Sequence, residues 1–327
     1  MLNCIGLKIM KYFLVIDQGT SSTRAILFDE NFCLVELSQT EFKQFFPKDG
    51  WVEHDANEIF DTVIHCINDV MKKSGTTHNE IISIGITNQR ETCLLWDKDG
   101  TPYGKAIVWQ DRRTAEVCNN LKQQGLEGEI NQLTGLLADP YFSGTKLSWM
   151  LEKAGKRKDL FMGTIDTFLI WKLTEGKSYF MDATNASRTL LMDIRNISWS
   201  DDMCNLLNIP IEKLPEIKNS ADDFGETSLF GGKIKISGVA GDQQAALFGQ
   251  GCFEEGEAKS TYGTGCFMML NTGSKIKFSK SNLLTTVGYR IAGKVTYALE
   301  GSIFMAGASV QWLRDNLEFF NTAPEIE

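Results

Sequence analysis

The stretch that decides the fold is Asp17-Gln18-Gly19-Thr20-Ser21-Ser22-Thr23-Arg24. It lies between two short apolar runs, residues 12–16 and 25–28, each with the composition of a β-strand. A connection rich in Gly, Ser and Thr between two strands predicts a β-hairpin. Its tip brings backbone N–H groups, hydroxyls and an arginine together, which is the chemistry of an anion cradle. Asp17 cannot bind phosphate itself, but it can hold the Mg²⁺ that accompanies a nucleotide.

A second segment of the same kind, residues 260–270, reads Ser-Thr-Tyr-Gly-Thr-Gly-Cys-Phe-Met-Met-Leu. Hydroxyls and glycines are again followed by an apolar strand. Either segment alone is more simply read as an ordinary glycine turn. The pair, with Asp242 shortly before the second, favours phosphate binding. Two such hairpins that face each other across a cleft are the arrangement of the actin-like ATPase fold.

Length and charge limit the classes of protein that fit. The chain has 327 residues, 43% hydrophobic and 23% charged, which is ordinary for a globular protein. A single core rarely grows beyond about 250–300 residues, so we expect two domains. The net charge is −9, and no basic run is longer than Lys156-Arg157-Lys158. Both features argue against nucleic acid or an anionic membrane as the main partner.

The cysteines and the N-terminus indicate the compartment. The eight cysteines form no Cys-x-x-Cys pair and the three histidines do not cluster with them, so no zinc site is expected. Cysteines scattered through apolar segments are typical of cytosolic proteins, and we expect a cytoplasmic location. No run approaches about 18 apolar residues, so no membrane span is predicted. Asp17 ends the first apolar run too early for a signal peptide, and residues 1–11 are expected to form a tail.

The order of elements predicts an α/β fold. Asp55, with Glu58 three residues later, is expected to cap a helix whose core face runs from Ile59 to Met71 at helical spacing. Strands are expected on both sides of this helix, which suits a mixed sheet covered by helices. Residues 139–146 and 182–189 are polar and are predicted to be loops. Residues 234–240 are predicted to be a strand that leads through Asp242 into a short helix.

The residues that could carry chemistry each have a simpler interpretation. The glycine motifs of P-loop and Rossmann proteins are absent. Asp242, between a strand and a helix, is a candidate base for an attacking hydroxyl or else a plain helix cap. Arg90 and Glu91 could bind neighbouring hydroxyls or form an exposed charged pair. Trp109 and Tyr141 could wall a pocket or belong to the core.

Eight segments of the sequence resemble glycerol kinases of the FGGY carbohydrate kinase family: residues 17–24, 85–92, 109–114, 139–145, 182–188, 241–250, 262–267 and 300–314. The match runs in register from about residue 12 to residue 315. The resemblance implies an α/β protein of the actin-like ATPase (ribonuclease H-like) fold, with mixed sheets flanked by helices. It also implies ATP-dependent phosphorylation of glycerol to sn-glycerol 3-phosphate with Mg²⁺, whereas the residues alone indicate only a small polyol with adjacent hydroxyls.

The resemblance also assigns roles to single residues. It implies Asp242 as the base and Asp17 as the carboxylate on the metal side. The residues implied to hold glycerol are Arg90, Glu91, Trp109, Tyr141, Asp242, Gln243 and Phe267. Those implied to border the nucleotide are Thr20, Ser21, Ser22, Arg24, Thr264, Gly307 and Gln311.

The chain departs from the family pattern at its C-terminal end. We expect an N-terminal domain over residues 12–233 and a second domain, incomplete and with an uncovered sheet edge, over residues 234–327. Residues 231–234 lack the arginine of the loop with which some bacterial members bind a sugar bisphosphate, so that control is not expected. The alternatives are an inactive remnant that binds glycerol or a partner chain, and a kinase for a related polyol or sugar. Homo-oligomerisation stays open.

Overall fold

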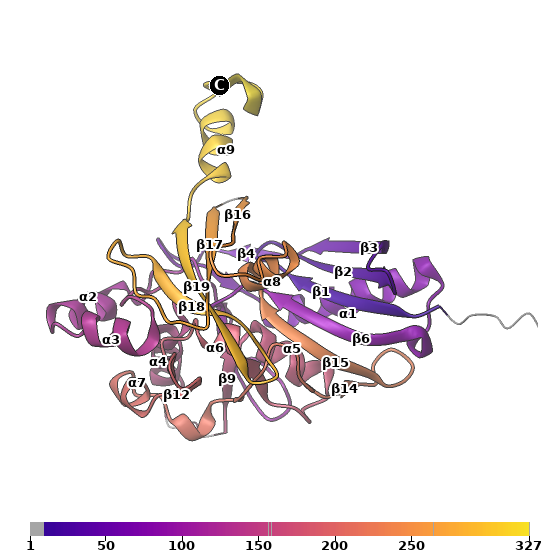
Figure 1. The fold of residues 1–327 in the computed structure, drawn as a ribbon, viewed down its shortest axis with the longest axis horizontal. Helices are drawn as coiled ribbons and strands as arrows, with labels where there is room; N and C mark the ends of the chain where they lie inside the picture. The colour runs from indigo at the N-terminus through magenta and orange to yellow at the C-terminus, as the bar shows by residue number, and fades with distance from the viewer. Residues whose placement is uncertain (1–9, 156, 158, 264, 327) are drawn as a thin grey trace, which may run out of the picture.

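The computed structural model describes residues 10–155, 157, 159–263 and 265–326. Its largest sheet has six strands in the order β14-β15-β6-β1-β2-β3 (Figure 1). The strands are β1 (Tyr12–Gln18), β2 (Ser22–Asp29), β3 (Leu34–Glu41), β6 (Ile81–Asn88), β14 (Glu226–Thr227) and β15 (Ile234–Gly241). β1, β6 and β15 are parallel, whereas β2 and β3 follow β1 as an antiparallel meander. The predicted first hairpin and the mixed sheet are therefore confirmed.

Helix α1 (Ala56–Ser74) packs against β2 and β3 of this sheet. The Asp55 carboxylate caps its first turn by accepting the backbone N–H groups of Asn57 and Glu58 at 3.0 and 3.3 Å. Gly75 ends the helix with a φ of 69°, a left-handed conformation that glycine adopts without strain. Both ends lie where the sequence predicts them, because caps and glycine stops are local signals.

A second sheet of five strands completes this part of the chain, in the order β4-β5-β8-β7-β9. Its strands are β4 (Gln44–Phe45), β5 (Glu53–His54), β7 (Cys93–Trp96), β8 (Ala106–Ile107) and β9 (Phe161–Thr164). The helices that follow in the chain are α2 (Ala115–Gln123), α3 (Glu127–Thr134), α4 (Ser143–Ala154), α5 (Ile165–Leu173), α6 (Ala183–Ala186) and α7 (Asp201–Leu206). One hydrophobic cluster joins both sheets, α1, α4 and α5.

Short elements make up the remaining connections. Two sheets of two strands each pair β10 (Phe180–Asp182) with β13 (Glu216–Lys218), and β11 (Met192–Asp193) with β12 (Ser198–Trp199). The 3₁₀ turns are η1 (His78–Glu80), η2 (Ile211–Lys213) and η3 (Ala323–Ile326).

Two segments predicted to be loops contain helix instead. Residues 182–189 hold the end of β10 and helix α6, and all of them are buried. Asp182 caps α6 by accepting the backbone N–H groups of Thr184 and Asn185, so these polar residues satisfy one another inside the protein. Within residues 139–146, α4 already begins at Ser143. Both segments were predicted to be exposed loops because they are polar. Polar side chains that hydrogen-bond to one another can be buried, so polarity alone did not require exposure to solvent.

Residues 258–303 form a separate antiparallel sheet, in the order β16-β17-β19-β18 (Figure 1). Its strands are β16 (Ala258–Tyr262), β17 (Cys266–Gly273), β18 (Leu284–Ile291) and β19 (Lys294–Ile303). Helix α8 (Asp242–Gly249) precedes it, and α9 (Gly307–Asp315) projects away from the body of the protein. Among the described strands, β16 pairs only with β17 and is thus an edge. The domain boundary expected at residue 233 falls before β15, a strand of the first sheet.

Candidate active site

The site lies at the carboxyl ends of three parallel strands. The register places Gln18 at the end of β1 opposite Asn88 at the end of β6, and Asn88 opposite Gly241 at the end of β15. The segments that follow these strands contain Thr20, Arg90 and Asp242, respectively. Neighbouring parallel strands end at one edge of the sheet, which is where open α/β sheets bind ligands.

A cavity of about 160 Å³ opens at this edge. Its lining residues are Thr20, Arg90, Glu91, Trp109, Tyr141, Asp242, Gln243, Thr261, Gly263, Gly265 and Phe267. Every residue predicted to hold the substrate is among them. The volume is below the range of about 300–1,000 Å³ that drug-sized ligands occupy, so it suits a molecule of a few carbon atoms.

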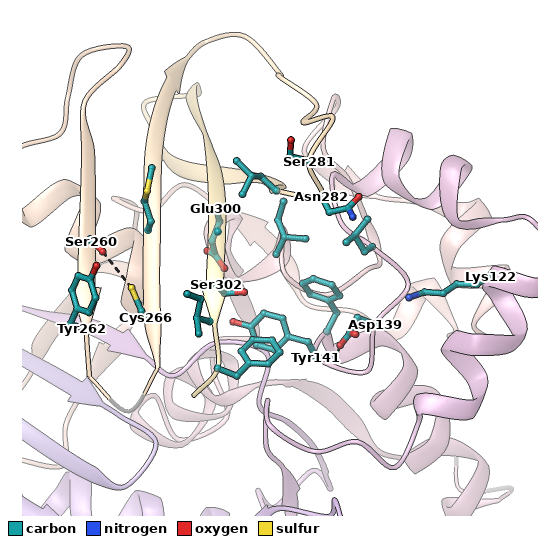
Figure 2. Close-up of a pocket in the computed structure, with 18 residues that line it drawn as sticks. Lys122, Asp139, Tyr141, Ser260, Tyr262, Cys266, Ser281, Asn282, Glu300 and Ser302 are labelled. Atoms are coloured by element: carbon teal, nitrogen blue, oxygen red, sulfur yellow. Dashed lines mark hydrogen bonds between the residues drawn. The ribbon is translucent and has the colours of Figure 1, made fainter. Parts of the chain in front are cut away.

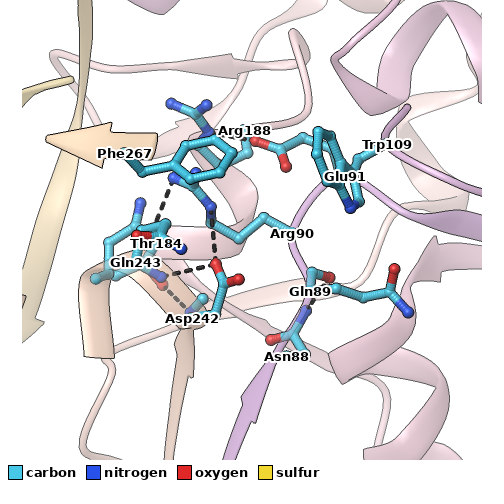
Figure 3. A network of polar contacts seen from close by, with 12 residues as sticks. Asn88, Gln89, Arg90, Glu91, Trp109, Thr184, Arg188, Asp242, Gln243 and Phe267 are labelled. Carbon is cyan, nitrogen blue, oxygen red and sulfur yellow. Dashed lines mark hydrogen bonds and ion pairs between the residues drawn. The ribbon is translucent and has the colours of Figure 1, made fainter. Parts of the chain in front are cut away.

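The Arg90 guanidinium is the central donor of the site (Figure 3). Its Nε lies 3.1 Å from Oδ1 of Asp242. Its Nη1 and Nη2 reach both carboxylate oxygens of Glu300 at 2.5 and 3.1 Å, and they also donate to Gln244 and Tyr141, each at 3.2 Å. Every N–H of the guanidinium therefore has a partner.

Asp242 carries the most accessible carboxylate next to this guanidinium. Its side chain keeps 36% of its surface accessible, whereas that of Arg90 keeps 2%. Burial raises the pKa of Asp242 above its usual range, the charges of Glu91 and Glu300 add to this rise, and Arg90 opposes it. The result is an ionisable oxygen that faces the cavity beside a fixed positive charge, an arrangement that suits a proton acceptor.

Arg90 and Glu91 are buried, at 3% and 1% exposure, and are not an exposed charged pair. Glu91 has a φ of 60°, in the left-handed region where a non-glycine residue is strained. Its carbonyl accepts the Ser143 hydroxyl at 3.0 Å, and its Oε1 accepts Nε of Arg188 at 2.6 Å. These bonds hold the strained backbone and turn the side chain toward the cavity.

An aromatic wall faces these charges. The Trp109 ring meets those of Tyr141, Phe267 and Phe304 with centroids 5.8, 6.0 and 5.8 Å apart. The Trp109 indole N–H donates to Oγ1 of Thr20 at 2.9 Å, which ties the wall to the first hairpin. Such a wall packs against CH groups, while the charges opposite bind hydroxyls.

The first hairpin brings only Thr20 to the cavity. Arg24 donates to Oδ2 of Asp17 at 3.0 Å and to Oε1 of Gln39 at 3.1 Å. The predicted phosphate ligand Arg24 and the predicted metal-side carboxylate Asp17 therefore bond to each other. The Ser22 hydroxyl accepts from Gln39 at 3.0 Å, and Ser21 is exposed. These residues line no part of the cavity described above.

The second hairpin places Gly263 and Gly265 in the cavity wall. Thr264, the predicted phosphate ligand, lies outside the described residues. Gly307 donates its backbone N–H to the Gly263 carbonyl at 3.0 Å, so the start of α9 touches this hairpin. Gln311 is exposed on α9.

A profile of the FGGY family of carbohydrate kinases, N-terminal domain, matches residues 12–249. The chain belongs to the FGGY family of carbohydrate kinases. This FGGY family chain is 57% identical to the glycerol kinase of Rhizobium meliloti (strain 1021) and 52% identical to that of Geobacillus sp. (strain WCH70). The first match covers 96% of the chain and the second 97%. The chain spans 65% and 66% of the length of these two relatives.

Solved structures agree with the fold of this FGGY family chain. The glycerol kinase of Plasmodium falciparum, solved with ADP, superposes with a TM-score of 0.90 at 40% identity, over 97% of this chain and 65% of that one. The gluconate kinase of Lactobacillus acidophilus superposes with a TM-score of 0.86 at 22% identity, over 97% and 64%. The predicted actin-like ATPase fold is confirmed.

Sequence reasoning missed four residues around the site of this FGGY family chain. Lys259 of β16 donates to Oε1 of Gln243 and, at 2.8 Å, to Oγ1 of Thr261. Burial, with the charge of Arg90, lowers the pKa of Lys259 to about 8. The others are Arg188, Glu300 and Phe304. The available signals were weak: a lysine inside a strand, and an arginine and a glutamate within segments that resemble the family.

A second cavity, of about 590 Å³, shares Tyr141 with the first and lies between the four-stranded sheet and the loop before α4 (Figure 2). No three His, Cys, Asp or Glu side chains of the described residues gather closely enough to hold a metal ion. In the same part of the chain, no helix has the length and apolar character needed to cross a membrane.

Proposed function

We propose that this chain carries the substrate site of an ATP-dependent glycerol kinase. The enzyme transfers the terminal phosphoryl group of ATP to a hydroxyl of glycerol and forms sn-glycerol 3-phosphate and ADP. One observation supports this most: a carboxylate, hydroxyl-binding charges and an aromatic wall line one small cavity together with parts of both hairpins. The glycerol kinases among the relatives supply the chemical class of the substrate.

Asp242 is the proposed base. The hydroxyl oxygen of glycerol bonds to phosphorus while its proton passes to the Asp242 carboxylate, and the bond from phosphorus to the ADP oxygen breaks. The raised pKa of Asp242 brings its basicity closer to that needed to accept this proton, and the charge of Arg90 opposes part of this rise.

The remaining residues of the cavity orient the polyol. Arg90, Glu91 and Gln243 present donors and acceptors to adjacent hydroxyls, while Trp109 and Phe267 pack against the carbon chain. A site that hydrogen-bonds each hydroxyl rejects an analogue lacking one by as much as about 10⁴-fold, because buried partners are left unpaired. This arrangement favours glycerol over monohydric alcohols.

The nucleotide is proposed to lie between the hairpins. Its phosphates would meet Thr20, Ser21, Ser22 and Arg24 on one side and Thr264 on the other, and Gly307 and Gln311 would border the nucleotide. Mg²⁺ commonly uses one or two carboxylates together with phosphate oxygens, so the single Asp17 carboxylate at the end of β1 fits this metal. Bound Mg²⁺ supplies charge neutralisation on the phosphates.

The thiols support the proposed cytoplasmic location. The described cysteines are all free, and most are buried. Burial raises the pKa of Cys93 to about 12, which keeps this thiol protonated and unreactive. Reduced, buried cysteines are ordinary in the cytosol.

Calorimetry with glycerol and a coupled assay of ADP release on the purified chain test the proposal. Asp242→Asn should retain the fold and lower turnover by about 10²–10⁴-fold. Glycerol binding without turnover in the wild type would indicate a binding remnant, and a higher kcat/KM for four- or five-carbon polyols would indicate a related kinase. Absence of both glycerol binding and turnover would contradict the proposal.

A further inference from the structure

Four buried charges next to the cavity form a closed ring. Glu300 receives Arg90 on both of its carboxylate oxygens, at 2.5 and 3.1 Å, and Nη2 of Arg188 on Oε1, at 2.9 Å. Arg188 in turn donates Nε to Oε1 of Glu91 at 2.6 Å. Because Arg90 and Glu91 are neighbours in the chain, the ring closes through their shared backbone.

The ring is almost fully desolvated and its charges balance. The Arg188 and Glu300 side chains are completely buried. Burial is the largest single influence on the pKa of Glu300 and raises it, but Arg188 and Arg90 together outweigh it and hold the pKa at about 2. Removing one partner from such a network leaves an uncompensated buried charge.

The ring also joins parts of the chain that are far apart. Arg90 follows β6 of the six-stranded sheet, Arg188 follows α6, and Glu300 lies on β19 of the four-stranded sheet. Arg90 and Glu300 are 210 positions apart. The position of the four-stranded sheet and the orientation of the Arg90 guanidinium are thus linked directly.

We propose that Arg188 and Glu300 are positioning residues for the polyol site, an inference that rests on the proposed function. Glu300 takes the two terminal nitrogens of Arg90 and so aims its Nε at Asp242. Arg188 holds Oε1 of Glu91, whose left-handed backbone would otherwise relax. Neither positioning residue lines the 160 Å³ cavity, so each acts on the polyol through its neighbour.

Calorimetric titration of the chain with glycerol tests this role in Glu300→Gln and Arg188→Lys. Glu300→Gln keeps the shape of the side chain, and Arg188→Lys keeps its charge. Both variants should weaken glycerol binding by at least about tenfold, the effect expected of one lost hydrogen bond to a charged group. Arg113→Lys is the matched control. The buried Arg113 bridges Asp111 and Glu53, each at 2.8 Å, outside the cavity. The Arg113→Lys variant should have a lower melting temperature than the wild type and an unchanged affinity for glycerol.

A second readout needs no glycerol. The pKa of the Asp242 carboxyl can be followed by ¹³C NMR in the presence of the charges that face it, which are Arg90, Glu91, Glu300 and Lys259. Glu300→Asp keeps the negative charge but shortens the side chain, so Arg90 should move out of line with Asp242. Because Arg90 lowers the pKa of Asp242, that pKa should then rise. In Arg113→Lys it should stay at the wild-type value.

The two readouts separate the two proposals. A higher Asp242 pKa in Glu300→Asp, together with weaker glycerol binding in Glu300→Gln, supports the positioning role. A higher Asp242 pKa in Glu300→Asp, in a chain whose wild type binds no glycerol, supports the positioning role and contradicts the proposed substrate. An Asp242 pKa in Glu300→Asp that equals or falls below the wild-type value overturns the positioning role whatever glycerol does. If Glu300→Gln fails to fold, glycerol binding is measured in Glu300→Asp instead, and the same weakening of at least about tenfold is expected.

Discussion

Nε of Arg90 lies 3.1 Å from Oδ1 of Asp242 in an ion pair, and the two residues follow adjacent parallel strands that end in register. All other N–H groups of Arg90 are taken by Gln244, Tyr141 and Glu300. A polyol hydroxyl that binds Arg90 must therefore displace Asp242 or one of these three partners from the guanidinium. Asp242, whose carboxylate is the accessible one, is the partner that a hydroxyl can reach.

Arg90→Lys should weaken glycerol binding by at least about a hundredfold. A lysine presents a point charge in place of a planar fork, so it cannot hold Glu300 on two oxygens and still reach Asp242. Because lysine keeps the positive charge, the unfolding free energy should fall by less than the about 3–5 kcal/mol that removing one partner of a buried ion pair costs. Calorimetry and urea denaturation measure the two effects. A glycerol Kd within twofold of the wild type would show that Arg90 does not contact the polyol.

Thr20→Val should loosen the aromatic wall. The substitution removes the acceptor of the Trp109 indole N–H, a bond of 2.9 Å, and should cost about 1 kcal/mol of stability. The emission of Trp109 should change, and the KM for glycerol should rise several-fold. Thr20→Ser keeps the hydroxyl and is the control. Equal KM values for Thr20→Val and Thr20→Ser would show that the hydrogen bond from Trp109 to Thr20 does not hold the aromatic wall in place for glycerol.

Gly307→Ala should displace the second hairpin. A Cβ at this position would lie 2.5 Å from the backbone carbonyl oxygen of Gly263, a contact that no side chain can relieve. We expect a loss of about 1–3 kcal/mol, as for other overpacked sites, and weaker ADP binding. Gly128→Ala, at an exposed position of α3 with no atom within 4 Å of the added Cβ, should instead stabilise the protein by about 0.5–1 kcal/mol. Similar losses in both variants would contradict the close approach.

His54 should make the protein less stable in acid. Burial lowers its pKa to about 3 in the folded protein, against 6.5 for an unperturbed histidine. Between these values the unfolded chain binds a proton that the folded chain does not, so unfolding free energy falls as the pH drops below 6.5, by up to about 1.4 kcal/mol per pH unit. His54→Gln should lack this component in urea titrations from pH 7 to pH 4. His65→Gln, at an exposed position of α1, should keep it.

Asp166 should have the opposite effect. Burial, with the charge of Asp182, raises its pKa to about 7, and its Oδ2 has no partner. The folded protein keeps a proton that the unfolded chain has lost, so stability falls as the pH rises from about 4 to 7. Relative to the wild type, Asp166→Asn should therefore gain stability over this interval and level off above pH 7. Asp61→Asn, on the exposed side of α1, serves as the control. A stability difference independent of pH would refute the raised pKa.

The sequence was most informative where the signal is local. The two hairpins, the Asp55 cap and the Asp242 junction between strand and helix were predicted because turns, caps and strand ends depend on residues close in the chain. The failure at residues 182–189 has the complementary cause. Asp182, Thr184 and Asn185 are polar but bond to one another, and nothing in the local pattern separates a buried helical segment with satisfied polar groups from an exposed loop.

By itself, the sequence determined which chemical groups are available: an acidic residue after a strand, an adjacent Arg-Glu pair, aromatic residues and two glycine-rich turns. Only the tertiary structure decided that Arg90 points at Asp242 and that Glu300 holds it there. The reason is physical, because a carboxylate and a guanidinium separated by 210 positions leave no periodic signal in the chain. Their pairing exists only once two sheets pack together and remove water from both charges.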